Sequence, residues 1–126
     1  MSRDEIPPEY AGWWRITDTS TWGHRHLDLC GTALISFTGY ADRLRMIALL
    51  AYVNVRPTKT GLSFTWSGAW EYDQVFGTGS VKLGKDGRLK GNLKIKDGDE
   101  STFVAERAEA PARPIEEPPS YTDKWR

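Results

Sequence analysis

The chain has 126 residues, a length that predicts a single domain. Its 17 basic and 17 acidic side chains give a formal net charge of +0, whereas proteins held to nucleic acid by phosphate contacts normally have a basic excess. No apolar run approaches the ~20 residues of a membrane helix, the N-terminus lacks the apolar core of a secretion signal, and the single cysteine excludes an internal disulfide. We therefore expect a cytoplasmic protein with no nucleic-acid partner and no membrane partner.

Composition shifts mark the two ends of the predicted domain. Residues 1–9 are polar and contain two prolines, and the segment from Ala108 onward is rich in proline and charge. Segments of this composition cannot bury a core. We therefore predict disordered tails at 1–9 and 108–126, and a folded domain over residues 10–107.

Between these tails the dominant sequence period is two. Leu62, Phe64 and Trp66 share one parity with polar residues between them, and the same alternation recurs around Leu93. Such alternation is typical of strands that have one face in a core and the other in water. We predict strands at 12–18, 32–38, 42–56, 61–70, 76–84, 88–96 and 101–107.

Short turns that contain glycine join the predicted strands, among them Gly84-Lys85-Asp86-Gly87 and Lys96-Asp97-Gly98-Asp99. Strands in this order form an antiparallel meander, and a meander of this length has to close because open edges invite aggregation. The predicted fold class is therefore all-β: a closed antiparallel up-and-down barrel of about eight strands.

His24, His26 and Asp28 follow the first predicted strand at intervals of two residues. On an extended segment these side chains face one way, and two imidazoles with a carboxylate are a ligand set that zinc accepts. Histidine pairs also occur in loops by chance, so we assign no metal and no cofactor to the chain. Cys30, near His26, is a conceivable nucleophile, but a free cysteine that enters a strand is more typical of a small buried apolar residue.

Segment 42–56 is longer than a typical strand and is apolar on both faces. Its apolar residues divide into Leu44, Met46 and Leu50 on one parity, and Ile47, Leu49, Val53 and Val55 on the other. Two interpretations are open: a bulge near Ile47 swaps the faces, or the outer face contacts a second copy in a homodimer. The segment is also long enough to bend or split and to supply the eighth strand.

Three aromatic residues, Phe64, Trp66 and Trp70, share the inner face of the predicted strand 61–70. Small barrels are filled by their own side chains or hold one small ligand. The three rings are therefore either a plug or the wall of a cavity for a flat or apolar molecule.

Two carboxylates, Glu71 and Asp73, follow this aromatic wall at the end of the strand and lie opposite glycines across a hairpin. At a barrel mouth they would act as acid and base or orient the polar end of a ligand. Carboxylates beside glycines more often accept hydrogen bonds from the amides of a turn, which is the other interpretation.

The first and last strands carry residues that resemble the closure signature of the calycins, the group of ligand-binding barrels that includes lipocalins and avidins. These residues are Gly12 and Trp14 on the first strand and Arg107 on the last. In that group the tryptophan packs across one end of the barrel under the basic residue, and a guanidinium stacks well on an indole. The resemblance implies a structural role for all three.

A second string is similar to a group of small bacterial lipocalin-like proteins. It runs Phe64-x-Trp66-x-Gly68-x-x-Glu71-x-Asp73-x-x-x-Gly77-x-Gly79, then Leu83, then Asp86-Gly87-x-Leu89-x-Gly91, and ends with Asp99, Ser101, Phe103, Ala105 and Arg107. The resemblance covers about residues 10–107. It implies a calycin-type barrel, and it implies no reaction, because that group has no established one.

These observations lead to three hypotheses about function. The first is non-catalytic binding of a small apolar or aromatic molecule inside the barrel, with Phe64, Trp66 and Trp70 as the wall and Glu71 or Asp73 at a polar end. The second is an isomerase or cyclase that uses the same carboxylates at the barrel mouth. The third is a structural or partner-binding module that uses segment 42–56 and the proline-rich tail.

Overall fold

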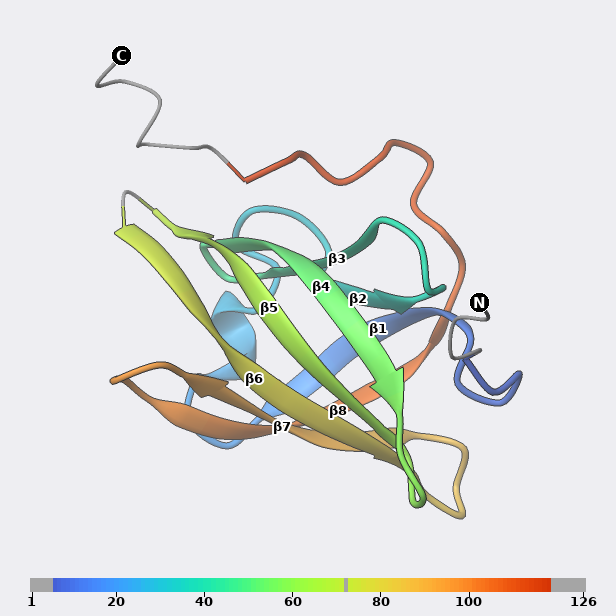
Figure 1. Cartoon of the computed structure of the whole chain (residues 1–126). Helices are drawn as coiled ribbons and strands as arrows, with labels where there is room; N and C mark the ends of the chain where they lie inside the picture. Colours follow the sequence, from blue (N-terminus) through green and yellow to red (C-terminus); the bar gives the residue numbers. More distant parts are fainter. Residues whose placement is uncertain (1–5, 72, 119–126) are drawn as a thin grey trace.

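The computed structural model describes residues 6–71 and 73–118 of the chain. Eight antiparallel strands follow one another around a closed barrel, and the last pairs with the first (Figure 1). They are β1 (Gly12–Thr19), β2 (Leu34–Phe37), β3 (Asp42–Met46), β4 (Leu49–Pro57), β5 (Leu62–Trp70), β6 (Asp73–Leu83), β7 (Leu89–Ile95) and β8 (Glu100–Ala108). The loop between β1 and β2 contains a short 3-10 helix, η1 (His24–His26). The predicted all-β closed barrel is therefore confirmed.

The long predicted strand 42–56 is split by a tight turn. β3 ends at Met46 and β4 begins at Leu49, and these two residues pair across the turn. Because the chain reverses direction at Ile47, apolar residues of both parities face the same core. The prediction that the segment splits to supply an extra strand is confirmed, and the bulge interpretation is wrong.

Ile47 has a backbone φ of 58°, a left-handed conformation that is sparsely populated by β-branched residues. Its side chain is 9% exposed, and its backbone N–H donates a hydrogen bond to the carbonyl oxygen of Leu27 at 2.8 Å. Burial and this hydrogen bond offset the local strain. They also tie the β3–β4 turn to the loop between β1 and β2.

One end of the barrel is closed by Trp14 and Arg107. The Trp14 side chain is 1% exposed, and its indole nitrogen donates a hydrogen bond to the carbonyl oxygen of Tyr10 at 2.9 Å. The guanidinium carbon of Arg107 lies 4.1 Å from the centroid of the Trp14 ring. Arg107 also donates hydrogen bonds to the backbone oxygens of Glu9 and Ala11. The predicted stacking of Arg107 on Trp14 is therefore confirmed.

The opposite end is covered by the loop that runs from Ser20 to Ala33, between β1 and β2. Leu27 of this loop is 3% exposed. The Trp22 ring lies 5.5 Å from the ring of Trp70, centroid to centroid, at the end of β5. We call this the loop-covered end.

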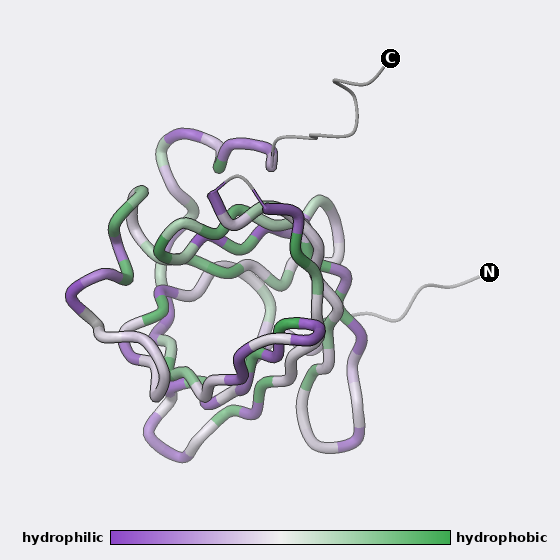
Figure 2. The backbone as a smooth tube through the Cα atoms, turned by 90° about the vertical axis from the view of Figure 1, so that its left-hand side faces the viewer, coloured by the Kyte–Doolittle hydropathy of each residue, from purple (hydrophilic) through white to green (hydrophobic). Residues whose placement is uncertain are grey.

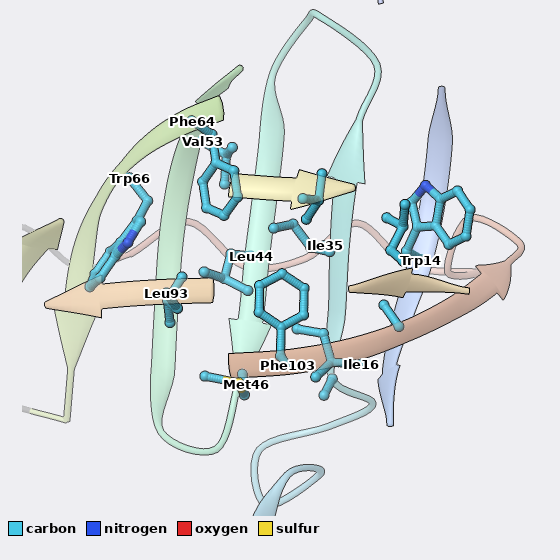
Figure 3. Close-up of a cluster of buried hydrophobic side chains, with 14 of the residues drawn as sticks. Trp14, Ile16, Ile35, Leu44, Met46, Val53, Phe64, Trp66, Leu93 and Phe103 are labelled. Carbon is cyan, nitrogen blue, oxygen red and sulfur yellow. The ribbon is translucent and has the colours of Figure 1, made fainter. Parts of the chain in front are cut away.

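The core lies inside the ring of strands that Figure 2 shows nearly along the barrel axis. Side chains from strands on all sides meet there, and Figure 3 shows Phe64, Leu44, Leu93 and Phe103 pointing inward from different strands. The Phe64 ring lies 5.8 Å from the ring of Phe37, centroid to centroid.

The segment after β8 runs along the outside of the barrel (Figures 1 and 2). Its Ile115 is 5% exposed, and the hydroxyl of Tyr52 on β4 donates a hydrogen bond to the carboxylate of Glu117 at 3.1 Å. Residues 1–5 and 119–126 of the predicted tails lie outside the described residues. The disorder of the tails therefore stays a prediction.

Candidate functional site

Two members of the predicted aromatic wall, Phe64 and Trp66, belong to the core. Their side chains are 3% and 2% exposed, and they pair across the sheet with Gly79 and Gly77. A Cβ atom added to Gly79 would lie 2.6 Å from Cε2 of Phe64, and one added to Gly77 would lie 2.8 Å from Cζ2 of Trp66. A Cβ atom on either glycine would also collide with a backbone oxygen of β7. The glycines therefore leave room both for the rings on the inner face and for the close approach of the neighbouring strand.

The interior towards the loop-covered end is also filled. Phe103 pairs with Gly91 in the same way, and a Cβ atom on Gly91 would lie 2.8 Å from Cζ of Phe103. The space that remains there does not hold a water molecule; it is lined by Ile16, Thr19, Trp22, Ile35, Leu44, Met46, Leu93, Ser101, Thr102 and Phe103. These contacts favour a barrel filled by its own side chains over a hollow one.

The other predicted site residues lie at the β5–β6 turn. Trp70 is half-buried against Trp22, and it pairs with Asp73 across the hairpin. Glu71 lies in the turn with a φ of 56°, and its backbone N–H donates a hydrogen bond to the carbonyl oxygen of Ala48 at 3.2 Å. Both carboxylate residues are exposed, and neither lines the interior space described above. The structure therefore does not bring Glu71 and Asp73 together with Phe64 and Trp66 in one site.

The histidine pair does not have the extended geometry that the zinc hypothesis needed. Residues 24–26 form η1, so the expectation that His24, His26 and Asp28 face one way on an extended segment is wrong. The Asp28 carboxylate pairs with Arg15 at 3.0 Å and accepts a hydrogen bond from the backbone of Ala33 at 2.7 Å. Within residues 6–71 and 73–118, no three His, Cys, Asp or Glu side chains are grouped in a way that would hold a metal ion.

Cys30 is exposed, so the expectation of a small buried cysteine that enters a strand is wrong. β2 begins only at Leu34, two residues later than the predicted strand 32–38. Cys30 instead lies in the loop that covers the barrel end.

A groove of about 590 Å³ lies on the outer face of β4–β7, and we call it the outer groove. It is lined by Asn54, Thr65, Trp66, Ser67, Phe76, Gly77, Thr78, Lys94, Lys96 and Asp97. Phe76 is 57% exposed, and the other outward-facing residues of β6 are polar. Sequence reasoning missed this groove. The available signal was that Phe76 has the parity opposite to that of the inward-facing Gly77 and Gly79.

The outer groove carries a small positive excess. Its lining contains two lysines, Lys94 and Lys96, and one acidic residue, Asp97. The ion pairs found in the described part of the chain are Arg15–Asp28 and Arg88–Glu106, so neither lysine of the groove belongs to one. Lys94 lies opposite Glu100 in the β7–β8 register, but the two form no ion pair among the described residues, so both lysines of the groove can contact a bound anion.

Comparison of the chain with protein-family models, with curated proteins and with solved structures finds no match. The calycin resemblance therefore stays a hypothesis that rests on the residues that carry it. In the described part of the chain, no helix has the length and apolar character needed to cross a membrane.

Proposed function

We propose that this protein is a non-catalytic binding module and that its site is the outer groove. The ligand would combine an apolar face with an anionic group. One observation carries the proposal: a ring that is 57% exposed, Phe76, shares a groove of about 590 Å³ with Lys94 and Lys96, which form no ion pair with any described residue. The sequence led to a different hypothesis, in which a small apolar or aromatic molecule binds inside the barrel. The filled interior moves the proposal to the outer face.

The chemistry of the groove sets the two requirements on the ligand. An apolar surface that covers Phe76 gains about 25 cal/mol for each Å² that leaves water. The ammonium groups of Lys94 and Lys96 attract a carboxylate or a phosphate, and neither gives up an existing ion pair among the described residues to do so. Hydroxyl groups of Thr65, Ser67 and other lining residues add hydrogen bonds that orient the bound molecule.

The proposal is tested by calorimetric titration with 2-naphthoate, an aromatic carboxylate. We expect binding that weakens about tenfold in Phe76→Ser and in Lys94→Gln, because each removes one class of contact. The matched control is Lys59→Gln, an exposed lysine in the turn after β4, and its affinity should equal that of the parent. Equal affinity in all three variants would contradict the proposal.

The barrel interior is a second candidate, as the site for a small apolar molecule in a calycin-like barrel. The observation that favours it is the loop over the barrel end, where Trp22 meets Trp70 through a contact between rings rather than through strand pairing. Trp22 borders the small interior space at this end, so removal of its ring would enlarge that space. Trp22→Ala should then raise the affinity for an uncharged apolar probe such as naphthalene, and an unchanged affinity would contradict it.

A further inference from the structure

A second groove continues the outer groove along the barrel wall. It has a volume of about 540 Å³, lies on the outer face of β5–β8 and is lined by Thr58, Thr60, Leu62, Ser63, Ser80, Val81, Lys82, Lys90, Gly91, Asn92, Thr102, Phe103 and Val104. Neighbouring outward positions on the same strands belong to the two grooves, such as Thr78 and Ser80 on β6. The two grooves share no lining residue but lie next to each other on this face, and we call the two together the lysine band.

Two lysines of the second groove lie directly opposite each other. Lys82 on β6 pairs with Lys90 on β7, and like charges at such positions repel. Neither lysine belongs to an ion pair found among the described residues. The pKa of nearby Asp86 is lowered, mainly by a hydrogen bond from the backbone of Arg88 and less by the charge of Lys90. The Asp86 carboxylate therefore already attracts Lys90, although the two form no ion pair among the described residues. An anion bound between Lys82 and Lys90 would relieve the repulsion that remains between them.

The lysines of the band are spaced for an extended ligand. Lys90 and Lys94 point outward from the same strand four residues apart, which corresponds to about 13 Å. The outward positions between these charges carry uncharged hydrogen-bonding groups, namely those of Thr78, Ser80 and Asn92. A ligand that fits the whole band therefore alternates anionic groups with hydroxyl groups.

We propose that the lysine band binds an acidic oligosaccharide, a sugar chain with carboxylate groups. This inference rests on the proposed function and names its ligand class. The carboxylates would contact the lysines, the sugar hydroxyls would contact Ser, Thr and Asn side chains, and the C–H face of one sugar ring would cover Phe76.

Two other polyanions fit the band less well. An acidic peptide in extended form would be held most strongly by backbone pairing with a sheet edge, and the eight described strands close into a barrel without offering one. A single-stranded nucleic acid would need several exposed rings for its bases and a basic protein, whereas the lining of the band exposes one ring, Phe76, and the chain has a net charge of +0.

The test is a calorimetric titration of the full chain with an oligogalacturonate hexamer. We expect the hexamer to bind at least about tenfold more tightly than the corresponding dimer. Only the hexamer is long enough to contact the lysines of both grooves at once, Lys82 and Lys90 in one and Lys94 and Lys96 in the other. The double variant Lys82→Gln/Lys90→Gln should lose most of this gain and keep its affinity for 2-naphthoate. The matched control is Lys59→Gln/Lys85→Gln, which removes two exposed lysines outside both linings and should leave the gain intact.

The outcomes separate this inference from the proposed function. Binding of 2-naphthoate without tighter binding of the hexamer would overturn the oligosaccharide inference alone. Loss of both would overturn the proposed function as well. Equal or tighter binding of a neutral maltohexaose, a hexaglutamate peptide or an oligothymidylate hexamer would also overturn the inference, since these probes lack the carboxylates, the sugar hydroxyls or both.

Discussion

At the scale of single residues, the sequence string around Phe64 and Trp66 is explained by packing. Each ring lies over a glycine on β6, where an added Cβ atom would collide both with the ring and with the backbone of the neighbouring strand β7. These residues therefore specify how the sheet curves over its own core, and they need no ligand to account for them. Trp14 is also explained by packing, because its indole lies under the guanidinium of Arg107.

Trp14→Ala should cost about 3 kcal/mol or more of the free energy of unfolding, because it removes a ring that is 1% exposed and leaves Arg107 without its support. Chemical denaturation measures this cost. The matched control is Trp13→Ala, since Trp13 is only half-buried and should cost clearly less. Equal losses for the two variants would show that Trp14 has no special part in closing the barrel.

Gly79→Ala should lower the stability by about 1–3 kcal/mol, because the added methyl group meets the Phe64 ring and cannot be accommodated without a shift of the sheet. Thermal unfolding followed by circular dichroism would report the change. Gly23→Ala serves as the control, since its added methyl group comes no closer than 4.0 Å to another side chain. If both variants melt at the same temperature, the ring-on-glycine explanation is wrong.

The environment of single side chains was predicted correctly on strands and wrongly in a loop. The meeting of Trp14 and Arg107 was expected from the calycin resemblance, and it agrees with the parity of both residues on strands that pair with each other. Cys30 lies in a loop, where no periodicity says which side chains are covered.

At the scale of elements, segment 42–56 shows what alternation leaves open. A segment with apolar residues of both parities can be a strand that is buried on both faces, a strand with a bulge, or two strands joined by a tight turn. The sequence pattern alone does not distinguish these three structures. The structure has the turn, with Ile47 in a left-handed conformation that a β-branched residue rarely adopts. The homodimer through this segment stays a prediction, but the turn removes the two-faced strand that suggested it.

The outer face of β4 carries a second element-scale contact, between Tyr52 and the C-terminal segment. The pKa of Tyr52 is raised above its ordinary value of about 10. The largest cause is partial removal of the hydroxyl from water, followed by its hydrogen bond to Glu117 and by the negative charge of the Glu117 carboxylate. Arg43 lies 4.4 Å from the Tyr52 ring and opposes the shift. Because the folded pKa is raised, this contact contributes stability below about pH 10 and loses it as the pH rises through the folded pKa.

Glu117→Gln should therefore lower the pKa of Tyr52 towards its ordinary value, because the negative charge beside the hydroxyl is removed. The measurement is an alkaline absorbance titration, with Tyr52→Phe used to subtract the other tyrosines. Glu116→Gln is the matched control and should leave the titration unchanged. If the Tyr52 pKa is the same in the parent chain, in Glu117→Gln and in Glu116→Gln, the C-terminal segment does not lie against β4.

At the scale of the whole molecule, the described side chains pack against one another inside the barrel, and the outer wall has two distinct sectors. One sector of its wall is contacted by the C-terminal segment, and another carries the outer groove. Pro118 of the C-terminal segment and Phe76 of the outer groove border a common hollow, so the two sectors meet there.

Fold class followed from the sequence because alternation states which side of each strand is apolar, and eight such strands have few ways to bury that side. The candidate site did not follow. A groove on the outer wall depends on how neighbouring strands coil. The packing of the interior depends on how rings such as Phe64 and Phe103 fit over glycines on other strands.

We propose that ligands bind on the outer face of the barrel and leave its interior closed. The most direct test follows backbone amide and side-chain methyl resonances by nuclear magnetic resonance during addition of 2-naphthoate. We predict shifts at the amides of Phe76, Thr78 and Lys94, with unchanged methyl signals of Met46 and Leu93. Shifted methyl resonances of Met46 and Leu93, together with unchanged amide resonances in the outer groove, would contradict binding on the outer face. They would place the ligand inside the barrel.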